Sequence, residues 1–195
     1  MRVNEIFYSL QGEGRYSGTA AVFVRLSGCN LSCPFCDTNF AFFQELTESD
    51  IVKAVVSLAG DCRLVVITGG EPTLQDCTLL IELLHSQDFT VCMESNGTHE
   101  PPENLDWLTI SPKDLFVGQR AAIKVKKCQE YKVVFDGIHI PEIPQDLEAW
   151  FYYLQPCDTG DPGRNENIMN ECINFIKQHP KWKLSLQTQK ILKVR

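Results

Sequence analysis

The chain has 195 residues, of which 44% are hydrophobic, and a formal net charge of −7. A mildly acidic chain of this size can bury one sizeable core but lacks the basic face of a nucleic-acid-binding protein, so we expect no nucleic acid partner. It opens without a long apolar run and contains no run of about 18 apolar residues, so we expect no signal peptide and no membrane span. Its nine cysteines would then mostly stay reduced, which favours a cytoplasmic location over a disulfide scaffold.

Apolar, β-branched runs alternate with helical patterns along the chain. Residues 3–10 are interpreted as an edge strand, and buried strands are predicted at 20–27, 63–68, 90–95, 107–111, 131–135, 150–155 and 183–187. Helices are predicted at 47–60, 74–87 and 165–179. The first helix opens with Thr47 and Asp50, a capping-box-like pair, and ends at Gly60.

Alternating strands and helices predict an α/β fold with a mostly parallel sheet. Eight full strand–helix repeats usually need about 250 residues, more than this chain has. Residues 112–130 and 136–149 are also interpreted as loops with little helix. We therefore predict an incomplete, open (β/α) barrel of about six core strands with about three helices. Residues 1–195 show no repeat and no linker, which predicts a single domain.

Several polar stretches have ordinary structural interpretations. Residues 113–132 hold six basic side chains, which we interpret as a solvated loop. Glu94 and Asn96 follow a strand and could face its functional edge, although Asn96–Gly97 is interpreted as an ordinary turn. The four histidines show no ligand spacing. Six cysteines are interpreted as small core side chains: Cys62, Cys77, Cys92, Cys128, Cys157 and Cys172.

Three further cysteines, Cys29, Cys33 and Cys36, crowd into one loop directly after a predicted strand. In parallel α/β folds such loops carry the functional site. Structural zinc usually takes four ligands, often as two distant pairs, and no histidine lies nearby. An iron–sulfur cluster with one iron not ligated by protein fits the triplet better. The open iron would then take a ligand from a small molecule.

The stretch VVITGGEP, residues 65–72, places a second loop on the same edge. Gly69 and Gly70 allow close backbone approach. We expect exposed carbonyls and the Glu71 carboxylate to accept hydrogen bonds from a ligand amine. Taken alone, the loop also fits a plain strand-to-helix turn with Pro72 at the helix entry.

The C-x3-C-x2-C spacing together with GGEP resembles the radical S-adenosylmethionine (SAM) superfamily. This resemblance implies a [4Fe–4S] cluster held by Cys29, Cys33 and Cys36, with SAM chelating the open iron. It also implies an adenosyl radical that abstracts a hydrogen from the substrate, while the protein positions and shields the cofactors.

Further stretches narrow the resemblance. SLQGEG (9–14), CDT (36–38) and SLQTQK (185–190) resemble the 7-carboxy-7-deazaguanine synthase family from Glu5 to the C-terminus. That implies a magnesium-assisted ring contraction of 6-carboxy-5,6,7,8-tetrahydropterin to 7-carboxy-7-deazaguanine and ammonia, in queuosine biosynthesis. It also implies a shortened barrel, a homodimer, and an electron donor that is flavodoxin-like or a chemical reductant.

The resemblance also implies individual roles. The residues matched to SAM contacts are Phe35, Cys36, Asp37, Gly70, Ser111, Pro112, Lys113, Gln155, Pro156, Cys157 and Asp158. The residues matched to substrate contacts are Leu10, Gln11, Gly12, Arg25 and Thr68, and Thr38 is matched to a magnesium ligand. Arg25 suits this role because a guanidinium can fork onto a substrate carboxylate.

Two departures and two alternatives accompany this interpretation. The family often has QTHK where this chain has QTQK, so Gln189 cannot supply a titrating group, and the chain ends in Val194–Arg195 where some members have a proline carboxylate. The first alternative is a glycyl-radical activating enzyme, against which SLQGEG and Arg25 speak. The second is a non-enzymatic iron–sulfur or zinc protein, which would leave GGEP and the Ser111–Lys113 segment without a purpose.

Overall fold

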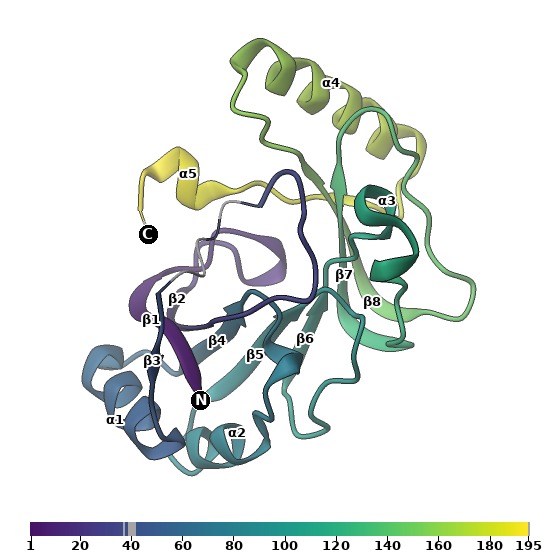
Figure 1. The fold of residues 1–195 in the computed structure, drawn as a ribbon. Helices are drawn as coiled ribbons and strands as arrows, with labels where there is room; N and C mark the ends of the chain where they lie inside the picture. The colour runs from purple at the N-terminus through teal and green to yellow at the C-terminus, as the bar shows by residue number, and fades with distance from the viewer. Residues whose placement is uncertain (37, 39–41, 195) are drawn as a thin grey trace.

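A computed structural model describes residues 1–36, 38 and 42–194, with the backbone alone for residues 119 and 120. Its described residues form a nine-stranded sheet in the order β3-β1-β2-β4-β5-β6-β7-β8-β9 (Figure 1). The strands are β1 (Arg2–Leu10), β2 (Ala20–Leu26), β3 (Gln44–Glu45), β4 (Leu64–Gly69), β5 (Thr90–Ser95), β6 (Trp107–Ile110), β7 (Lys127–Phe135), β8 (Glu148–Pro156) and β9 (Lys183–Leu184).

The sheet is open and mostly parallel. β1 pairs antiparallel with both β2 and β3, whereas each neighbouring pair from β2 to β9 is parallel. The two edges are β3 and β9, so the sheet does not close on itself. This confirms the predicted incomplete barrel, with seven parallel strands where about six were expected. Only the first two residues of the predicted strand 183–187 are extended.

Five α-helices and three short 3-10 helices lie within the described residues. They are η1 (Gly14–Tyr16), α1 (Glu48–Ala59), η2 (Pro72–Leu74), α2 (Thr78–His85), α3 (Asp114–Val117), η3 (Gly118–Ala121), α4 (Pro162–Gln178) and α5 (Thr188–Leu192). The Thr47 hydroxyl caps α1 by accepting from the amide of Asp50, as predicted. α2 begins later than predicted, because the 3-10 helix η2 ends at Leu74 and residues 75–77 are not helical. α4 begins earlier, since Asp161 caps it ahead of Pro162.

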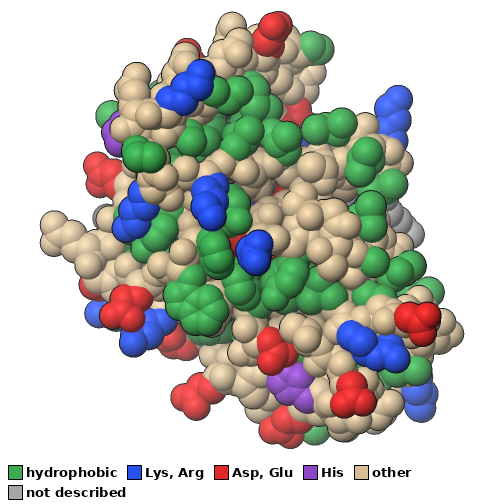
Figure 2. Space-filling model, turned by 180° about the vertical axis from the view of Figure 1, so that it is seen from behind, with side chains coloured by type: hydrophobic (Ala, Val, Ile, Leu, Met, Phe, Trp, Pro, Cys, Tyr) green, Lys and Arg blue, Asp and Glu red, His purple; other side chains and the backbone are tan. Residues whose placement is uncertain are grey.

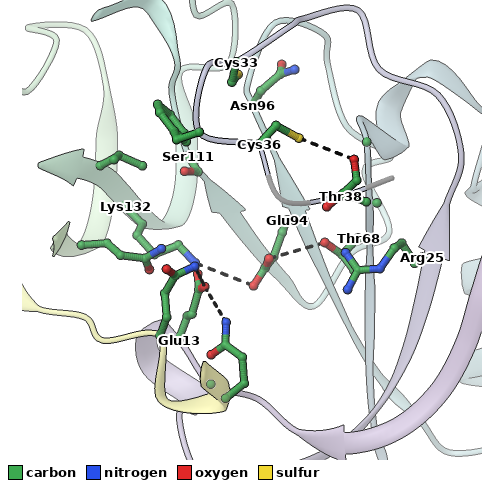
Figure 3. Close-up of a pocket in the computed structure, with 18 of the residues that line it drawn as sticks. Glu13, Arg25, Cys33, Cys36, Thr38, Thr68, Glu94, Asn96, Ser111 and Lys132 are labelled. Atoms are coloured by element: carbon green, nitrogen blue, oxygen red, sulfur yellow. Dashed lines mark hydrogen bonds and ion pairs between the residues drawn. The ribbon is translucent and has the colours of Figure 1, made fainter. Parts of the chain in front are cut away.

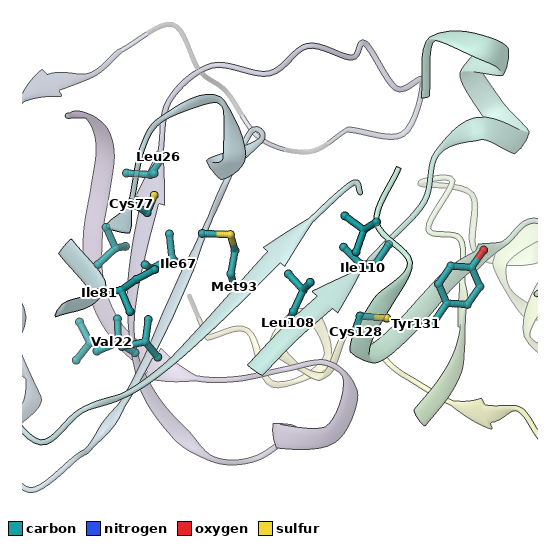
Figure 4. Close-up of a cluster of buried hydrophobic side chains, with 14 of the residues drawn as sticks. Val22, Leu26, Ile67, Cys77, Ile81, Met93, Leu108, Ile110, Cys128 and Tyr131 are labelled. Atoms are coloured by element: carbon teal, nitrogen blue, oxygen red, sulfur yellow. The ribbon is translucent and has the colours of Figure 1, made fainter. Parts of the chain in front are cut away.

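The main core lies between the sheet and the long helices. Side chains from α1, α2 and α4 pack against alternate residues of the strands, such as Val22, Val24 and Leu26 of β2 (Figure 4). The alternation places Phe23 and Arg25 on the opposite, inner face. Arg25 lies in register with Thr68 of β4, so both belong to that inner face.

A second, smaller cluster of buried hydrophobic side chains lies on the inner face of the sheet. Phe7, Phe23, Val66 and Trp107 belong to it, with Phe151 packed against them. Seen from behind, the surface gathers hydrophobic side chains with Lys and Arg side chains among them (Figure 2). Within the described part of the chain, no helix is both long and apolar enough to cross a membrane.

Candidate active site

A cavity of about 760 Å³ opens on the inner face, and its walls include the carboxyl ends of the parallel strands. The predicted site residues that line it are Leu10, Gln11, Gly12, Arg25, Cys29, Cys33, Phe35, Cys36, Thr38, Thr68, Gly70, Ser111, Lys113, Gln155, Pro156, Cys157 and Asp158. Pro112 is buried and does not line the cavity. Asp37 lies outside the described residues, as does Arg195. The structure therefore brings the predicted residues together, while their roles stay predictions.

The cysteine loop after β2 forms one wall of the cavity. Cys29 and Cys33 are half-buried and Cys36 is exposed, and all three are free thiols. Burial raises the pKa of Cys29 and of Cys33, and the charge of Lys113 opposes this rise. Among the described residues, no three Cys, His, Asp or Glu side chains converge as ligands of one metal ion do. Three soft thiols on one wall instead fit a cluster, which spreads its cysteine ligands over separate irons.

The glycines after β4 let a second loop reach the cysteine loop. A Cβ at Gly70 would collide with the carbonyl of Gly28, and one at Gly69 would collide with the carbonyl of Leu26. The amide of Gly70 donates to the Leu26 carbonyl at 3.1 Å, and the amide of Glu71 donates to the Gly28 carbonyl at 2.9 Å. Only glycine at these positions allows so close an approach of the two backbones.

The Glu71 carboxylate has a different role from the one expected. It is 1% exposed and accepts from Ser95 Oγ at 2.8 Å, from the Asn96 amide at 2.6 Å and from Thr73 Oγ1 at 2.6 Å. Its oxygens are used within the protein and it does not line the cavity, so the prediction that it accepts from a ligand amine is wrong. The carboxylate fastens the glycine loop to the end of β5.

Asn96 takes part in the same architecture. Its Nδ2 donates to Asn30 Oδ1 at 3.0 Å, and its Oδ1 accepts from the amide of Thr98 at 3.0 Å. Asn30 in turn donates to Thr98 Oγ1 at 2.9 Å. The segment after β5 is thus more than the ordinary turn predicted, because it holds the cysteine loop through Asn30.

The other end of the cavity carries buried charges. Lys132 of β7 is 4% exposed, and its Nζ lies 2.5 Å from Glu13 Oε2 and 3.8 Å from Glu94 Oε1 (Figure 3). Gln11 Nε2 donates to Glu94 Oε1 at 2.9 Å, and Thr68 Oγ1 lies 3.5 Å from Glu94 Oε2. In Figure 3 Lys132 points toward Glu13 and Glu94, away from the labelled thiols.

The charges of this group support one another. Burial raises the pKa of Glu13, but the charge of Lys132 and hydrogen bonds from Lys132, Gln189 and Gln187 outweigh it and hold the pKa at about 2. Burial lowers the pKa of Lys132, but Glu13, Glu94 and Glu130 raise it above its ordinary value. The ionised Glu13 therefore stabilises the fold above about pH 4.5, and this contribution is lost as the pH falls toward 2.

The basic segment 113–132 is therefore only in part a solvated loop. Lys124, Lys126 and Lys127 are exposed as expected. Lys132 is buried because β7 begins at Lys127, so Lys132 belongs to a central strand. Lys113 lines the cavity, bonds Ser111 Oγ at 2.7 Å, and burial lowers its pKa to about 8.

The C-terminal segment covers the loop after β1. Gln187 Nε2 and Gln189 Nε2 donate to Glu13 Oε1 at 3.1 and 3.0 Å, and the Thr188 hydroxyl donates to the Gly12 carbonyl at 2.8 Å. Gly12 packs directly on the Gln189 amide, which leaves no room there for a side chain. Lys190 Nζ also donates to Asp158 Oδ2 at 2.9 Å. The segment containing the unusual Gln189 is thus part of the cavity wall.

Arg25 lies at the rim between these two ends. Its Nε donates to Glu5 Oε1 at 2.9 Å, and its guanidinium stacks over the Phe7 ring at 5.7 Å. The side chain is 24% exposed and lines the cavity. Since a guanidinium carries five N–H donors, the bond to Glu5 accounts for one of them.

Comparisons with known proteins agree with this geometry. The radical SAM superfamily model matches residues 23–116. The chain is 42% identical to 7-carboxy-7-deazaguanine synthase of Bacteroides thetaiotaomicron, across 100% of this chain and 98% of that protein. It is 40% identical to the protein of the same name from Nitratidesulfovibrio vulgaris, across 98% of this chain and 97% of that protein. This chain belongs to the 7-carboxy-7-deazaguanine synthase family.

A solved structure supports the assignment of this chain to the 7-carboxy-7-deazaguanine synthase family. The crystal structure of QueE from Escherichia coli matches with a TM-score of 0.71 and 26% identity, across 95% of this chain and 92% of that one. As radical SAM enzymes, members of the 7-carboxy-7-deazaguanine synthase family use a [4Fe–4S] cluster and SAM. These findings favour the family over a glycyl-radical activating enzyme or a non-enzymatic metal protein.

The residues that sequence reasoning missed in this synthase site are Glu13, Gln187 and Lys132, and Glu94 was left undecided. Glu13 lies inside SLQGEG, but only the residues before it, Leu10, Gln11 and Gly12, were matched to substrate contacts. Lys132 begins the apolar stretch KVVF, and a lysine inside a buried-strand pattern is itself a signal of a paired, buried charge. Gln187 carried no comparable signal in the sequence.

Proposed function

We propose that this chain catalyses the radical SAM-dependent ring contraction of 6-carboxy-5,6,7,8-tetrahydropterin to 7-carboxy-7-deazaguanine, with release of ammonia. One observation carries the proposal. A single cavity joins a wall of three thiols to a wall of arginine, lysine and carboxylates, so a cluster-bound cofactor and a polar bicyclic substrate can meet inside it.

The cofactor end is proposed to consist of the cysteine and glycine loops. Cys29, Cys33 and Cys36 would ligate the cluster, and the backbone around Gly70 would lie against SAM. Ser111, Lys113 and the strand end from Gln155 to Asp158 would complete the SAM site. When bound, the cluster and SAM supply the radical that starts the reaction, and the protein walls exclude water from it.

The substrate end is proposed to recognise opposite edges of the pterin. Arg25 would pair with the substrate carboxylate, with Thr68 beside it in register on β4. The aminopyrimidine edge of the pterin presents N–H donors, which need acceptors. The carboxylates of Glu13 and Glu94 are acceptors of the right kind at the other side of the cavity.

The remaining parts of the proposal concern partners. Thr38 would contribute an oxygen ligand to magnesium together with substrate oxygens and water. A flavodoxin-like protein or a chemical reductant would supply the electron. A homodimer, a single domain spanning residues 1–195 and a cytoplasmic location complete the proposal.

The test is the identity of the product. Anaerobic incubation of the iron- and sulfide-reconstituted protein with SAM, magnesium, reductant and the carboxylated tetrahydropterin should form 7-carboxy-7-deazaguanine, detected by mass spectrometry. SAM cleavage without this product would contradict the proposed substrate and revive the glycyl-radical activating alternative. Absence of both iron uptake and SAM cleavage would contradict the radical SAM proposal itself.

A further inference from the structure

Lys132 is buried where no solvent can compensate its charge, and it meets carboxylates from three elements. Glu13 approaches from the loop after β1, Glu94 from β5, and Glu130 from two residues earlier on β7. Lys113 is the other cation that acts on it. Because Glu130, Lys132 and Val134 alternate along β7, all three point to the inner face.

These three carboxylates lie close together, and only Glu130 among them is fully buried, so their mutual repulsion needs a cation to offset it. Burial raises the pKa of Glu130, and Glu13 and Glu94 raise it further. Glu130 is 2% exposed and accepts from the amide of Arg15 at 2.9 Å, so it serves the loop backbone. Glu13 and Glu94 differ, since both line the cavity and both contact Lys132.

We propose that Lys132 is a positioning residue whose ammonium fixes the carboxylates of Glu13 and Glu94 as acceptors for the N–H edge of the pterin. This inference rests on the proposed function above. Lys132 acts through the two carboxylates: its Nζ lies 2.5 Å from Glu13 Oε2 and 3.8 Å from Glu94 Oε1, and both carboxylates line the cavity that would receive the substrate.

The geometry supports a positioning role over a merely structural one. Each carboxylate has a second support: Gln187 and Gln189 bond the other oxygen of Glu13, and Gln11 bonds Glu94. These amides orient the carboxylates but carry no charge. Only Lys132, among the described residues, touches both carboxylates with a cation.

The test compares Lys132→Met, Lys132→Arg and the wild type, with Lys127→Met as the matched control. Lys127 lies on the same strand and pairs with Glu148 at 3.1 Å, but it is 78% exposed. The affinity of the reconstituted protein for the carboxylated tetrahydropterin is measured by anaerobic equilibrium dialysis from pH 6 to 9. SAM cleavage without pterin and the thermal midpoint are measured on the same preparations.

We expect Lys132→Met to bind the pterin at least about 30-fold more weakly at pH 7, because one partner of a buried charge pair is lost. Its affinity should rise more steeply with pH than that of the wild type, since Lys132 no longer holds the pKa of Glu13 low and this carboxylate is protonated more readily. Lys132→Arg should keep the wild-type pH dependence but bind several-fold more weakly, because the guanidinium is larger. Lys127→Met should match the wild type.

Three results would overturn the inference while leaving the proposed function standing. The first two are wild-type pterin affinity in Lys132→Met and an unchanged pH dependence of that affinity. The third is a fall of both SAM cleavage and thermal midpoint in Lys132→Met with no change in the pH dependence of pterin binding. If Lys132→Met does not fold, Lys132→Arg decides, and a pH dependence shifted from that of the wild type in that variant would overturn the inference. A wild-type protein that fails to bind the pterin would instead contradict the proposed function.

Discussion

The two ends of the cavity are built in different ways. The thiol end comes from two short contiguous stretches, CNLSCPFC (29–36) and TGGEP (68–72), and the second bonds the backbone of Leu26 and Gly28 just before the first. The carboxylate end is assembled from side chains that lie far apart in the chain, with Lys132 119 positions after Glu13. A contiguous motif is readable from sequence, whereas an assembled site depends on the fold.

The sharpest way to separate the two ends is to remove a thiol. Cys33→Ala should abolish SAM cleavage. Among the described cysteines that line the cavity, only Cys29 and Cys36 share its loop, so no further thiol of the loop can replace the lost ligand. Pterin binding should persist, since the carboxylate end is untouched. Iron content, SAM cleavage and pterin affinity are measured together. Cys62→Ala, a half-buried thiol outside the cavity, is the control. Wild-type SAM cleavage by Cys33→Ala would refute the ligand assignment.

The second prediction tests the contact between the two backbones at the thiol end. In Gly70→Ala the new methyl group would meet the Gly28 carbonyl, which is backbone and cannot rotate away. Overpacking of this kind costs about 1–3 kcal/mol, so SAM affinity should fall by roughly 5- to 150-fold. Gly163→Ala is the control, since its methyl group would meet only ordinary contact distances. Unchanged SAM binding in Gly70→Ala would show that the loop spacing is not critical.

Sequence reasoning succeeded where a local pattern decides the structure. The Thr47 cap, the parallel strand runs and the cysteine spacing each depend on neighbours in the chain. It failed where a distant partner decides. Glu71 was assigned to a ligand because Ser95 and the Asn96 amide, which bind it, were not known to lie beside it. Lys132 was counted with a solvated basic loop although it falls within the predicted strand 131–135, because its partner Glu13 lies on another element.

Arg25 lies between the two ends of the cavity, so its removal tests which of the two ends it serves. Arg25→Ala should weaken pterin binding by about ten- to a hundredfold, the value of a charge-assisted bond to a desolvated carboxylate at roughly 1.5–3 kcal/mol. SAM cleavage without substrate should persist. Arg25→Lys should recover only part, because an ammonium cannot fork onto two oxygens. Affinity is measured by equilibrium dialysis.

A structural role for Arg25 makes a different forecast. Its bond to Glu5 would then dominate, and the thermal midpoint and SAM cleavage of Arg25→Ala would fall together. Arg63→Ala is the matched control, since Arg63 bonds the carbonyls of Gly60 and Cys62 and does not line the cavity. Normal pterin affinity in a well-folded Arg25→Ala protein would remove Arg25 from the substrate site.

The smallest effect is expected at Thr38, which lines the cavity two residues after the last cysteine. Thr38→Val keeps the shape of the side chain and removes its hydroxyl oxygen. Water can replace one neutral oxygen ligand of magnesium, so the loss should be near 1 kcal/mol, about fivefold in the magnesium concentration needed for half-maximal product formation. SAM and pterin affinities without magnesium should stay at wild-type values, because no charge changes at either end of the cavity. Thr90→Val, an exposed threonine at the start of β5, is the control. An unchanged magnesium dependence in Thr38→Val would place the metal elsewhere. Equal losses at every magnesium concentration would instead make the Thr38 hydroxyl a structural part of the loop that carries the cysteines.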